Sequence, residues 1–211
     1  MEAGLFKLDH TKPTVSVLIP IYNGLQFFEN LITQINKFPP YVQIILVNDG
    51  STDVSKEVFN LFFQKIPNCI LIHQSHLGLV HALNNGLSNC STDFVARLDI
   101  DDEYINGRFE NQFEFLIRNP DCAAVFCDYN FFNLNRKELG FMPSAVDADL
   151  VHLSLINPQR CPHSGVMFRR TKVLQVGGYM PEDFPAEDLG LWIRLINNRN
   201  KICSLPLVLL N

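Results

Sequence analysis

The chain has 211 residues, of which 47% are apolar and 18% charged, and its formal net charge is −5. This length suits one domain of roughly 100–200 residues, and the composition is that of a globular protein with a buried core. The acidic balance argues against a nucleic acid or an anionic membrane surface as the partner.

Strands and helices are predicted to alternate through the first half of the chain. The predicted strands are short β-branched, apolar runs at residues 15–20, 42–47, 70–72 and 94–98. Between them, apolar residues recur at helical spacing over residues 27–35, 54–62 and 77–87, and Ser51 or Thr52 is the expected N-cap of the second helix. Four alternations predict an α/β domain with a mixed, mostly parallel central sheet flanked by helices.

The second half has a looser pattern. It predicts helices at residues 107–118, 147–155 and 188–197, and strands at 123–127, 165–168 and 202–210. Trp192 shares an apolar helix face with Leu191 and Leu195, which predicts a place in the core. The chain stops directly after an apolar run, so we expect it to be a domain cut from a longer protein, with further domains after residue 211.

Six cysteines are scattered without a CxxC pair, and we expect them to be reduced. A zinc site formed by Cys122, Cys127, Cys161 and His163 is an alternative, although the spacing lacks a zinc knuckle. The N-terminus does not have the pattern of a signal peptide, and no run has the ~18 apolar residues of a membrane span. These features predict a soluble protein of the cytoplasm, or of the host cytoplasm if the protein is viral.

Polar side chains follow the predicted strands at the sheet edge where parallel sheets bind ligands. Asp99, Asp101 and Asp102 follow the fourth strand, and strand alternation would place Asp99 and Asp101 on one face. Two carboxylates so close repel each other unless a cation lies between them, and their oxygens suit Mg²⁺ or Mn²⁺. A solvated acidic turn that caps the next helix is the alternative.

Several motifs resemble those of family 2 glycosyltransferases, which are inverting enzymes of the GT-A fold. The matching segments are SVLIPIYN at 16–23, VNDGSTD at 47–53, GLVHALNNGL at 78–87, DFVARLDIDD at 93–102, PHSGVMFR at 162–169, GGY at 177–179 and AEDLGLWIR at 186–194. They occur in family order over nearly the whole chain. In length and in the way it ends, the chain also resembles the N-terminal domain of multidomain chlorella-virus glycosyltransferases.

The resemblance implies a role for particular residues. The nucleotide-sugar would be bound by Pro20, Tyr22, Asn23, Asp49, Gly78, Asn84, Arg97, Asp99 and His163. Asp49 would accept a hydrogen bond from uracil, although Asn48 stands where many members have a second acid. Asp101, with Asp99, would bind Mn²⁺ or Mg²⁺ through the DxD motif. Asp188 would be the general base and Glu187 would orient the acceptor or the loop.

The resemblance therefore predicts one GT-A catalytic domain over residues 1–211. Residues 14–102 would bind the nucleotide, and residues 103–211 would bind the acceptor and carry the base. The implied partners are a UDP-sugar donor and a glycan or glycoconjugate acceptor. Alternatives are a non-catalytic nucleotide- or sugar-binding module and a sugar nucleotidyltransferase, which would need a Gly-rich, basic signature where this chain reads PIYNG.

Overall fold

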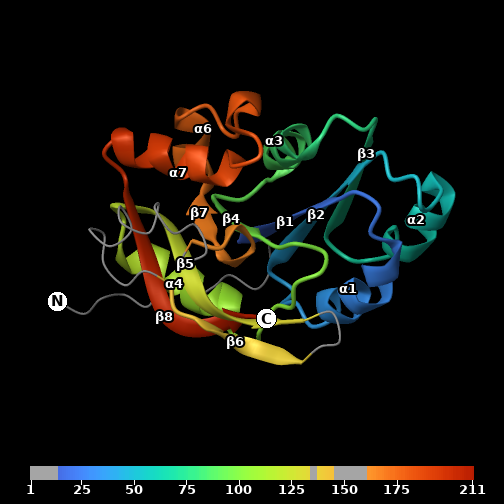
Figure 1. The fold of residues 1–211 in the computed structure, drawn as a ribbon, viewed down its shortest axis with the longest axis horizontal. Helices are drawn as coiled ribbons and strands as arrows, with labels where there is room; N and C mark the ends of the chain where they lie inside the picture. Colours follow the sequence, from blue (N-terminus) through green and yellow to red (C-terminus); the bar gives the residue numbers. More distant parts are fainter. Residues whose placement is uncertain (1–13, 134–136, 145–160) are drawn as a thin grey trace.

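The computed structural model describes residues 14–133, 137–144 and 161–211, and within them one sheet organises the chain (Figure 1). The strand order is β3-β2-β1-β4-β7-β5-β6, and β8 pairs with β5. The strands are β1 (Val15–Ile21), β2 (Val42–Asp49), β3 (Cys69–Gln74), β4 (Phe94–Arg97), β5 (Cys122–Phe132), β6 (Glu138–Met142), β7 (Met167–Arg169) and β8 (Lys201–Leu210).

The sheet is mixed and mostly parallel, as predicted. β3, β2, β1 and β4 run parallel to one another, and β8 runs parallel to β5. β7 is antiparallel to both β4 and β5, and β6 is antiparallel to β5 at the edge. Every residue of β1 and β2 is buried, which is why both read as continuous apolar runs.

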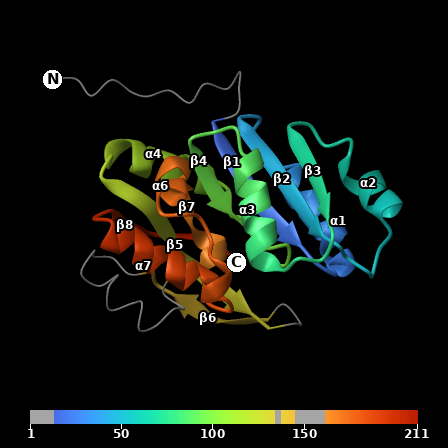
Figure 2. The ribbon, with the colours of Figure 1, turned by 90° about the horizontal axis from the view of Figure 1, so that it is seen from above.

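Helices cover both faces of the sheet (Figures 1 and 2). The α-helices are α1 (Phe28–Ile35), α2 (Lys56–Phe63), α3 (Leu79–Asn89), α4 (Arg108–Arg118), α6 (Arg170–Gln175) and α7 (Glu187–Asn197). Short 3₁₀ turns are η1 (Leu25–Phe27), η3 (His163–Gly165) and η4 (Pro181–Asp183). One core packs α1, α2 and α4 against the sheet, and a second core packs α3, α6 and α7 against the opposite face.

Alternation along β1 explains how one strand serves both cores. Val17 and Ile19 belong to the first core, while Leu18 points to the second. Helix α3 packs very closely on that side, because Gly86 has no side chain. A Cβ at position 86 would lie 2.1 Å from a Leu18 methyl carbon, so a larger residue would require the Leu18 side chain to shift or α3 to move away from the sheet.

Several local predictions were wrong. The N-cap of α2 is Ser55, whose Oγ accepts a hydrogen bond from Val58 N at 3.3 Å, so the helix begins later than Ser51 or Thr52 would allow. The buried face of α2 carries Phe59 and Phe63. Strand β6 and helix α6 were missed, β5 is longer than expected, and the helix predicted at 147–155 lies outside the described residues.

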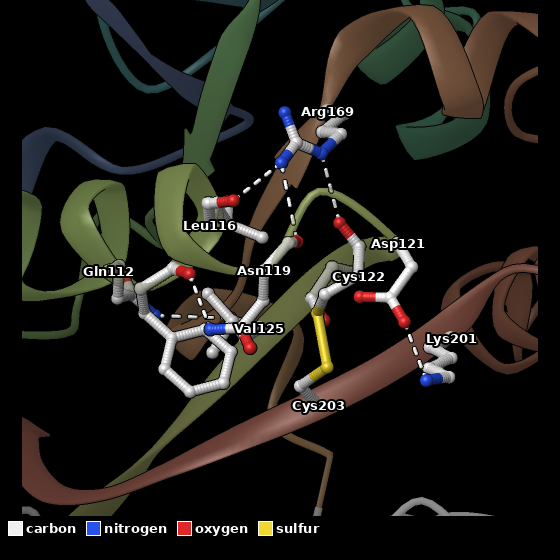
Figure 3. The surroundings of a disulfide bond; sticks show 11 residues. Gln112, Leu116, Asn119, Asp121, Cys122, Val125, Arg169, Lys201 and Cys203 are labelled. Carbon is white, nitrogen blue, oxygen red and sulfur yellow. Dashed lines mark hydrogen bonds and ion pairs between the residues drawn. A yellow bond between two sulfur atoms is a disulfide. The ribbon is translucent and has the colours of Figure 1, made fainter. Parts of the chain in front are cut away.

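Cys122 and Cys203 form a disulfide that joins neighbouring strands β5 and β8 (Figure 3). The expectation that all six cysteines are reduced is therefore wrong for this pair, which spacing alone could not identify. The zinc alternative is wrong too, because Cys122 is not available as a thiolate. Beside the bridge, Arg169 Nε donates to the Cys122 carbonyl at 3.0 Å (Figure 3).

None of the helices within the described ranges has both the length and the hydropathy that crossing a bilayer requires.

Candidate functional site

Two cavities lie beside the carboxyl ends of the parallel strands, and Asp99 lines both of them. The nucleotide-side cavity has a volume of about 520 Å³ and is lined by Pro20, Ile21, Tyr22, Asp49, His76, Leu77, Gly78, Leu79, Val80, His81, Ala82, Asp99, Pro181 and Phe184. The acceptor-side cavity has a volume of about 630 Å³ and is lined by Phe27, Asp99, Asp101, Asp102, Glu103, Tyr129, Asn130, Phe131, Phe132, Asn133, Pro162, His163, Ser164, Leu210 and Asn211.

Asp49 organises the wall of the nucleotide-side cavity. Asp49 is only 3% exposed, and its carboxylate has four hydrogen-bond partners at the end of β3 and in the segment that follows. Oδ1 accepts from Gln74 Nε2 at 2.7 Å and Leu77 N at 2.9 Å, and Oδ2 pairs with His76 Nδ1 and Gly78 N, both at 2.9 Å. These donors fill the capacity of a carboxylate, so in this arrangement Asp49 shapes the loop rather than offering a free acceptor to a base.

Tyr22 stacks on His76 at the mouth of the same cavity. The ring centroids are 4.0 Å apart and the planes differ by 17°. The Tyr22 side chain is about half exposed, so a flat aromatic surface is available to a planar ligand. Sequence reasoning missed His76, although it follows the third parallel strand and the rule that ligands bind at carboxyl strand ends would have found it.

Asn23 ties the loop after β1 to the loop after β2. Its Oδ1 accepts from Thr52 N at 2.8 Å, and its own N–H donates to Ser51 Oγ at 3.1 Å. Gly50 lets the loop after β2 approach the backbone of His76, because a Cβ at position 50 would lie 2.6 Å from His76 N. The φ of Gly50 is +69°, which also favours glycine. Asn23 does not line either cavity and positions Tyr22 through the backbone.

The acidic segment does not continue the strand. β4 ends at Arg97, and Asp101 lies in a turn, so the alternation argument does not hold. The turn nevertheless brings Asp99 and Asp101 to the acceptor-side cavity, and of these two only Asp99 also lines the nucleotide-side cavity. Arg97 is 1% exposed and donates from Nη2 to Asp99 Oδ1 at 2.6 Å. This buried hydrogen bond holds the Asp99 carboxylate in place.

Burial and charge act in opposite directions on the acids of this turn. Burial raises the pKa of Asp99, but the Arg97 charge and hydrogen bond outweigh it and the net pKa lies below the ordinary value. The pKa of Asp102 rises to about 6, because the side chain is buried and because Asp99 and Asp101 repel its charge. Three carboxyl groups thus lie close together at this turn, and Arg97 pairs with one of them, Asp99.

The carboxylates of Asp99 and Asp101 fit a divalent cation whose other ligands are phosphate oxygens and water. Within the described residues, no group of three or more His, Cys, Asp or Glu side chains forms a complete metal cage. Mg²⁺-type ions, however, commonly use one or two carboxylates and complete their coordination with substrate phosphates and water. Asp99 and Asp101 on one cavity wall meet that requirement, and the neighbouring carboxyl groups of the turn favour a cation.

His163 lies beside this turn and its ring is neutral. Its Nε2 hydrogen bonds to Tyr179 Oη at 2.9 Å. Burial, followed by the Arg97 charge, lowers the pKa of His163 from 6.5 to about 3. A neutral His163 can offer a hydrogen bond to a ligand in the acceptor-side cavity, which it lines, but not a positive charge.

We expect His163 to make the protein less stable in acid. Its pKa is lower in the folded state, so the unfolded chain takes up a proton first and stability falls as the pH drops from about 6.5 towards 3. Replacing His163 by Gln should make this fall shallower, by up to about 1.4 kcal/mol per pH unit, the slope for one proton. Urea unfolding of the wild type and of His163→Gln between about pH 3 and 6.5 measures this difference. If the free energy of unfolding falls equally steeply with pH in both proteins, the lowered pKa of His163 is refuted.

Two other polar side chains near the site hold the backbone. Asn84 does not line either cavity; its Nδ2 donates to Tyr179 O at 2.7 Å and its Oδ1 accepts from Tyr179 N at 3.0 Å. Arg108 is fully buried and donates to the carbonyls of Arg97 and Ser164. Arg108 therefore positions the segments that carry Asp99 and His163, and Asn84 positions the backbone of Tyr179, whose hydroxyl group hydrogen bonds to His163.

Glu187 and Asp188 begin helix α7. Burial is the main cause that raises the pKa of both carboxyls, and the charges of Arg97 and Asp99 act on both. Glu187 is 5% exposed, and its Oε2 has no hydrogen-bond partner within the described part of the chain. Neither acid lines either of the two cavities described above, but Pro181 and Phe184, just before α7, line the nucleotide-side one.

Comparison with known proteins gives the family. The model of "Glycosyl transferase family 2" matches residues 16–176. The amylovoran biosynthesis glycosyltransferase AmsE of Erwinia amylovora is 31% identical over 201 residues, which are 92% of this chain and 74% of that protein. A UDP-Gal:alpha-D-GlcNAc-diphosphoundecaprenol beta-1,3-galactosyltransferase of Escherichia coli is 27% identical over 191 residues, 88% of this chain and 69% of that protein.

Solved structures agree on the fold. TarS (residues 1–349) of S. aureus in complex with UDP-GlcNAc superposes with a TM-score of 0.74 at 16% identity, covering 93% of this chain and 57% of that one. The mannosyltransferase PcManGT of Pyrobaculum calidifontis, in complex with GDP-Man and Mn²⁺, has a TM-score of 0.68 at 20% identity, covering 92% of this chain and 55% of that one. The chain thus spans little more than half of these structures. With this GT-A fold and the family match over residues 16–176, the chain belongs to glycosyl transferase family 2 and is a glycosyltransferase.

Proposed function

We propose that this chain moves a sugar from a UDP-sugar to a hydroxyl group of a glycan or glycoconjugate, with inversion at the anomeric carbon. The observation that carries the proposal is the position of Asp99, which lines both cavities. A donor on one side and an acceptor on the other would meet at this residue. The Escherichia coli relative is named for a UDP-Gal donor, and TarS was solved with UDP-GlcNAc, which favours uridine.

The nucleotide would occupy the nucleotide-side cavity, within the half formed mainly by residues 14–102. The base would pack against Tyr22, whose ring is kept in place by His76. Pro20 and Gly78 would leave room for the nucleotide, because both line this cavity. If Asp49 contacts the base, as the resemblance implies, one of its four present donors must give way.

Asp101 and Asp99 would hold the divalent cation, Mn²⁺ or Mg²⁺. When bound, such an ion offsets the negative charge that builds on the nucleoside diphosphate as it leaves. Arg97 keeps the Asp99 carboxylate charged and in place through its 2.6 Å hydrogen bond. His163, being neutral, would contribute a hydrogen bond near the diphosphate.

Asp188 would act as the general base. The acceptor oxygen forms a bond to the anomeric carbon, the bond from that carbon to the phosphate oxygen breaks, and UDP leaves with the electron pair. The hydroxyl proton passes to the Asp188 carboxylate, whose pKa is raised by burial and which is therefore a stronger base than an exposed aspartate. Glu187, with a buried and unpartnered Oε2, would orient the acceptor or the loop.

A stereochemical assay tests the proposal. The purified protein, with Mn²⁺, is supplied with α-linked UDP-sugars and with sugar acceptors, and the product is analysed by NMR. We expect UDP release together with a β-linkage in the product. An α-linked product would overturn inversion, and turnover of GDP-sugars but not UDP-sugars would overturn the donor assignment.

A further inference from the structure

An aromatic surface lies at the far end of β5, on the wall of the acceptor-side cavity. The segment from Tyr129 to Asn133 lines this cavity together with Asp99 and Asp101. Phe131 and Phe132 remain 37% and 39% exposed, although large aromatic side chains are usually buried. Two exposed phenylalanines beside the acidic turn indicate a surface that a ligand covers.

The ring of Phe131 is supported from behind by a glycine. Phe131 pairs with Gly140 across the edge strands β5 and β6. A Cβ at position 140 would lie 2.9 Å from Phe131 Cζ and 3.2 Å from Cε1, so the ring rests against the bare backbone. The far end of the ring is therefore packed against β6, and the partly exposed ring remains available at the cavity.

Polar residues line the same cavity as this ring. Asn130 Nδ2 donates to Asn211 Oδ1 at 3.1 Å, and both residues line the same cavity. Asp101 and Asp102 lie on the opposing turn. A pyranose needs this combination, because its C–H face packs on an aromatic ring while its hydroxyl groups hydrogen bond to amides and carboxylates. A purely hydrocarbon ligand would leave these polar groups without partners.

We infer that Phe131 is the platform for an uncharged pyranose ring of the acceptor. The inference rests on the proposed function and specifies the acceptor class. Among the described residues that line this cavity there are four acids, Asp99, Asp101, Asp102 and Glu103, and no Lys or Arg. Asp102 and Glu103 are not part of the proposed cation site, so a uronic acid or a sugar phosphate placed on Phe131 would face their negative charge, and a neutral ring is favoured.

Saturation-transfer NMR with methyl glycosides of glucose, galactose and N-acetylglucosamine, in the presence of UDP and Mn²⁺, tests the inference. We expect saturation of the C–H protons of at least one glycoside and a dissociation constant that rises roughly five- to tenfold in Phe131→Ala, as for the loss of one aromatic contact. Phe141→Ala is the matched control, because Phe141 is exposed on β6 and does not line the cavity. Gly140→Ala should weaken binding as well, by displacing the ring.

The outcomes separate this inference from the proposed function. Binding of UDP without saturation of any glycoside, or equal binding by wild type and Phe131→Ala, would overturn the platform and leave the donor site intact. Preference for methyl glucuronide or geranyl phosphate over all three neutral glycosides would also overturn it. Glycoside binding that depends on Phe131 in a protein that does not bind UDP would support the platform and refute the UDP-sugar assignment.

Discussion

Replacing Asp188 by asparagine is expected to lower kcat by at least about 100-fold, the usual scale for loss of a general base. The amide keeps the size of the side chain but cannot take the proton of the acceptor hydroxyl. UDP affinity should stay unchanged, because Asp188 does not line the nucleotide-side cavity. Initial rates and a UDP titration of the same preparation provide both numbers.

The matched control for this change is Asp121→Asn, which removes an exposed carboxylate that pairs with Lys201 at the other end of the sheet. It should leave kcat within about twofold of wild type, as expected for an exposed surface pair. Near wild-type turnover in Asp188→Asn with normal UDP binding would show that another group is the base. Because burial raises the pKa of Asp188, wild-type kcat should fall on the acid side at a pH above the ordinary aspartate value of 3.8.

Replacing Trp192 by alanine is expected to lower the free energy of unfolding by about 3–5 kcal/mol. Trp192 is 1% exposed in the core between α7 and the sheet, and it contacts Phe126 edge to face at 5.2 Å between ring centroids. Removal of the indole leaves a cavity that backbone relaxation fills only partly. Urea unfolding at constant pH measures the change.

The neighbouring residue supplies the control for Trp192. Ile193 is 40% exposed on the same helix, and Ile193→Ala should cost about 1 kcal/mol or less because little apolar area is lost from water. A loss below about 1 kcal/mol in Trp192→Ala would mean that the core between α7 and β5 collapses around the gap or contributes little to stability.

The sequence predicted the parallel half of the fold well, because its strands are buried on both faces. β1 and β2 read as unbroken apolar runs, so neither needed long-range information. β6 was missed because its residues Glu138 to Met142 are exposed or only partly buried at the sheet edge. The Cys122–Cys203 disulfide was missed for another reason: it depends on the pairing of β5 with β8, which local patterns do not contain.

For the candidate site, too, local patterns predicted some residues, and contacts between distant segments determined the others. Motif spacing found Asp99, Asp101 and Tyr22, which the fold brings to the cavities at the strand ends. It did not find His76, which stacks on Tyr22 between two loops, although its place after the third strand was a usable signal. It did not find Phe131, because the contact of Phe131 with Gly140 depends on the pairing of β5 with β6. The hydrogen bonds of Asp49 and Asn84 also required coordinates, since a carboxylate or amide in a motif does not reveal which partner it binds.

Calorimetric titration with UDP, with and without Mn²⁺, on wild type and Asp101→Ala tests the central claim most directly. The account predicts that Mn²⁺ strengthens UDP binding to the wild type at least about tenfold, a coupling of about 1.4 kcal/mol, and that Asp101→Ala loses this dependence. Glu114→Gln, which alters an exposed acid of α4, should keep it. Equal Mn²⁺ dependence in wild type and Asp101→Ala would contradict the metal assignment, and no binding of UDP to the wild type would contradict the donor site itself.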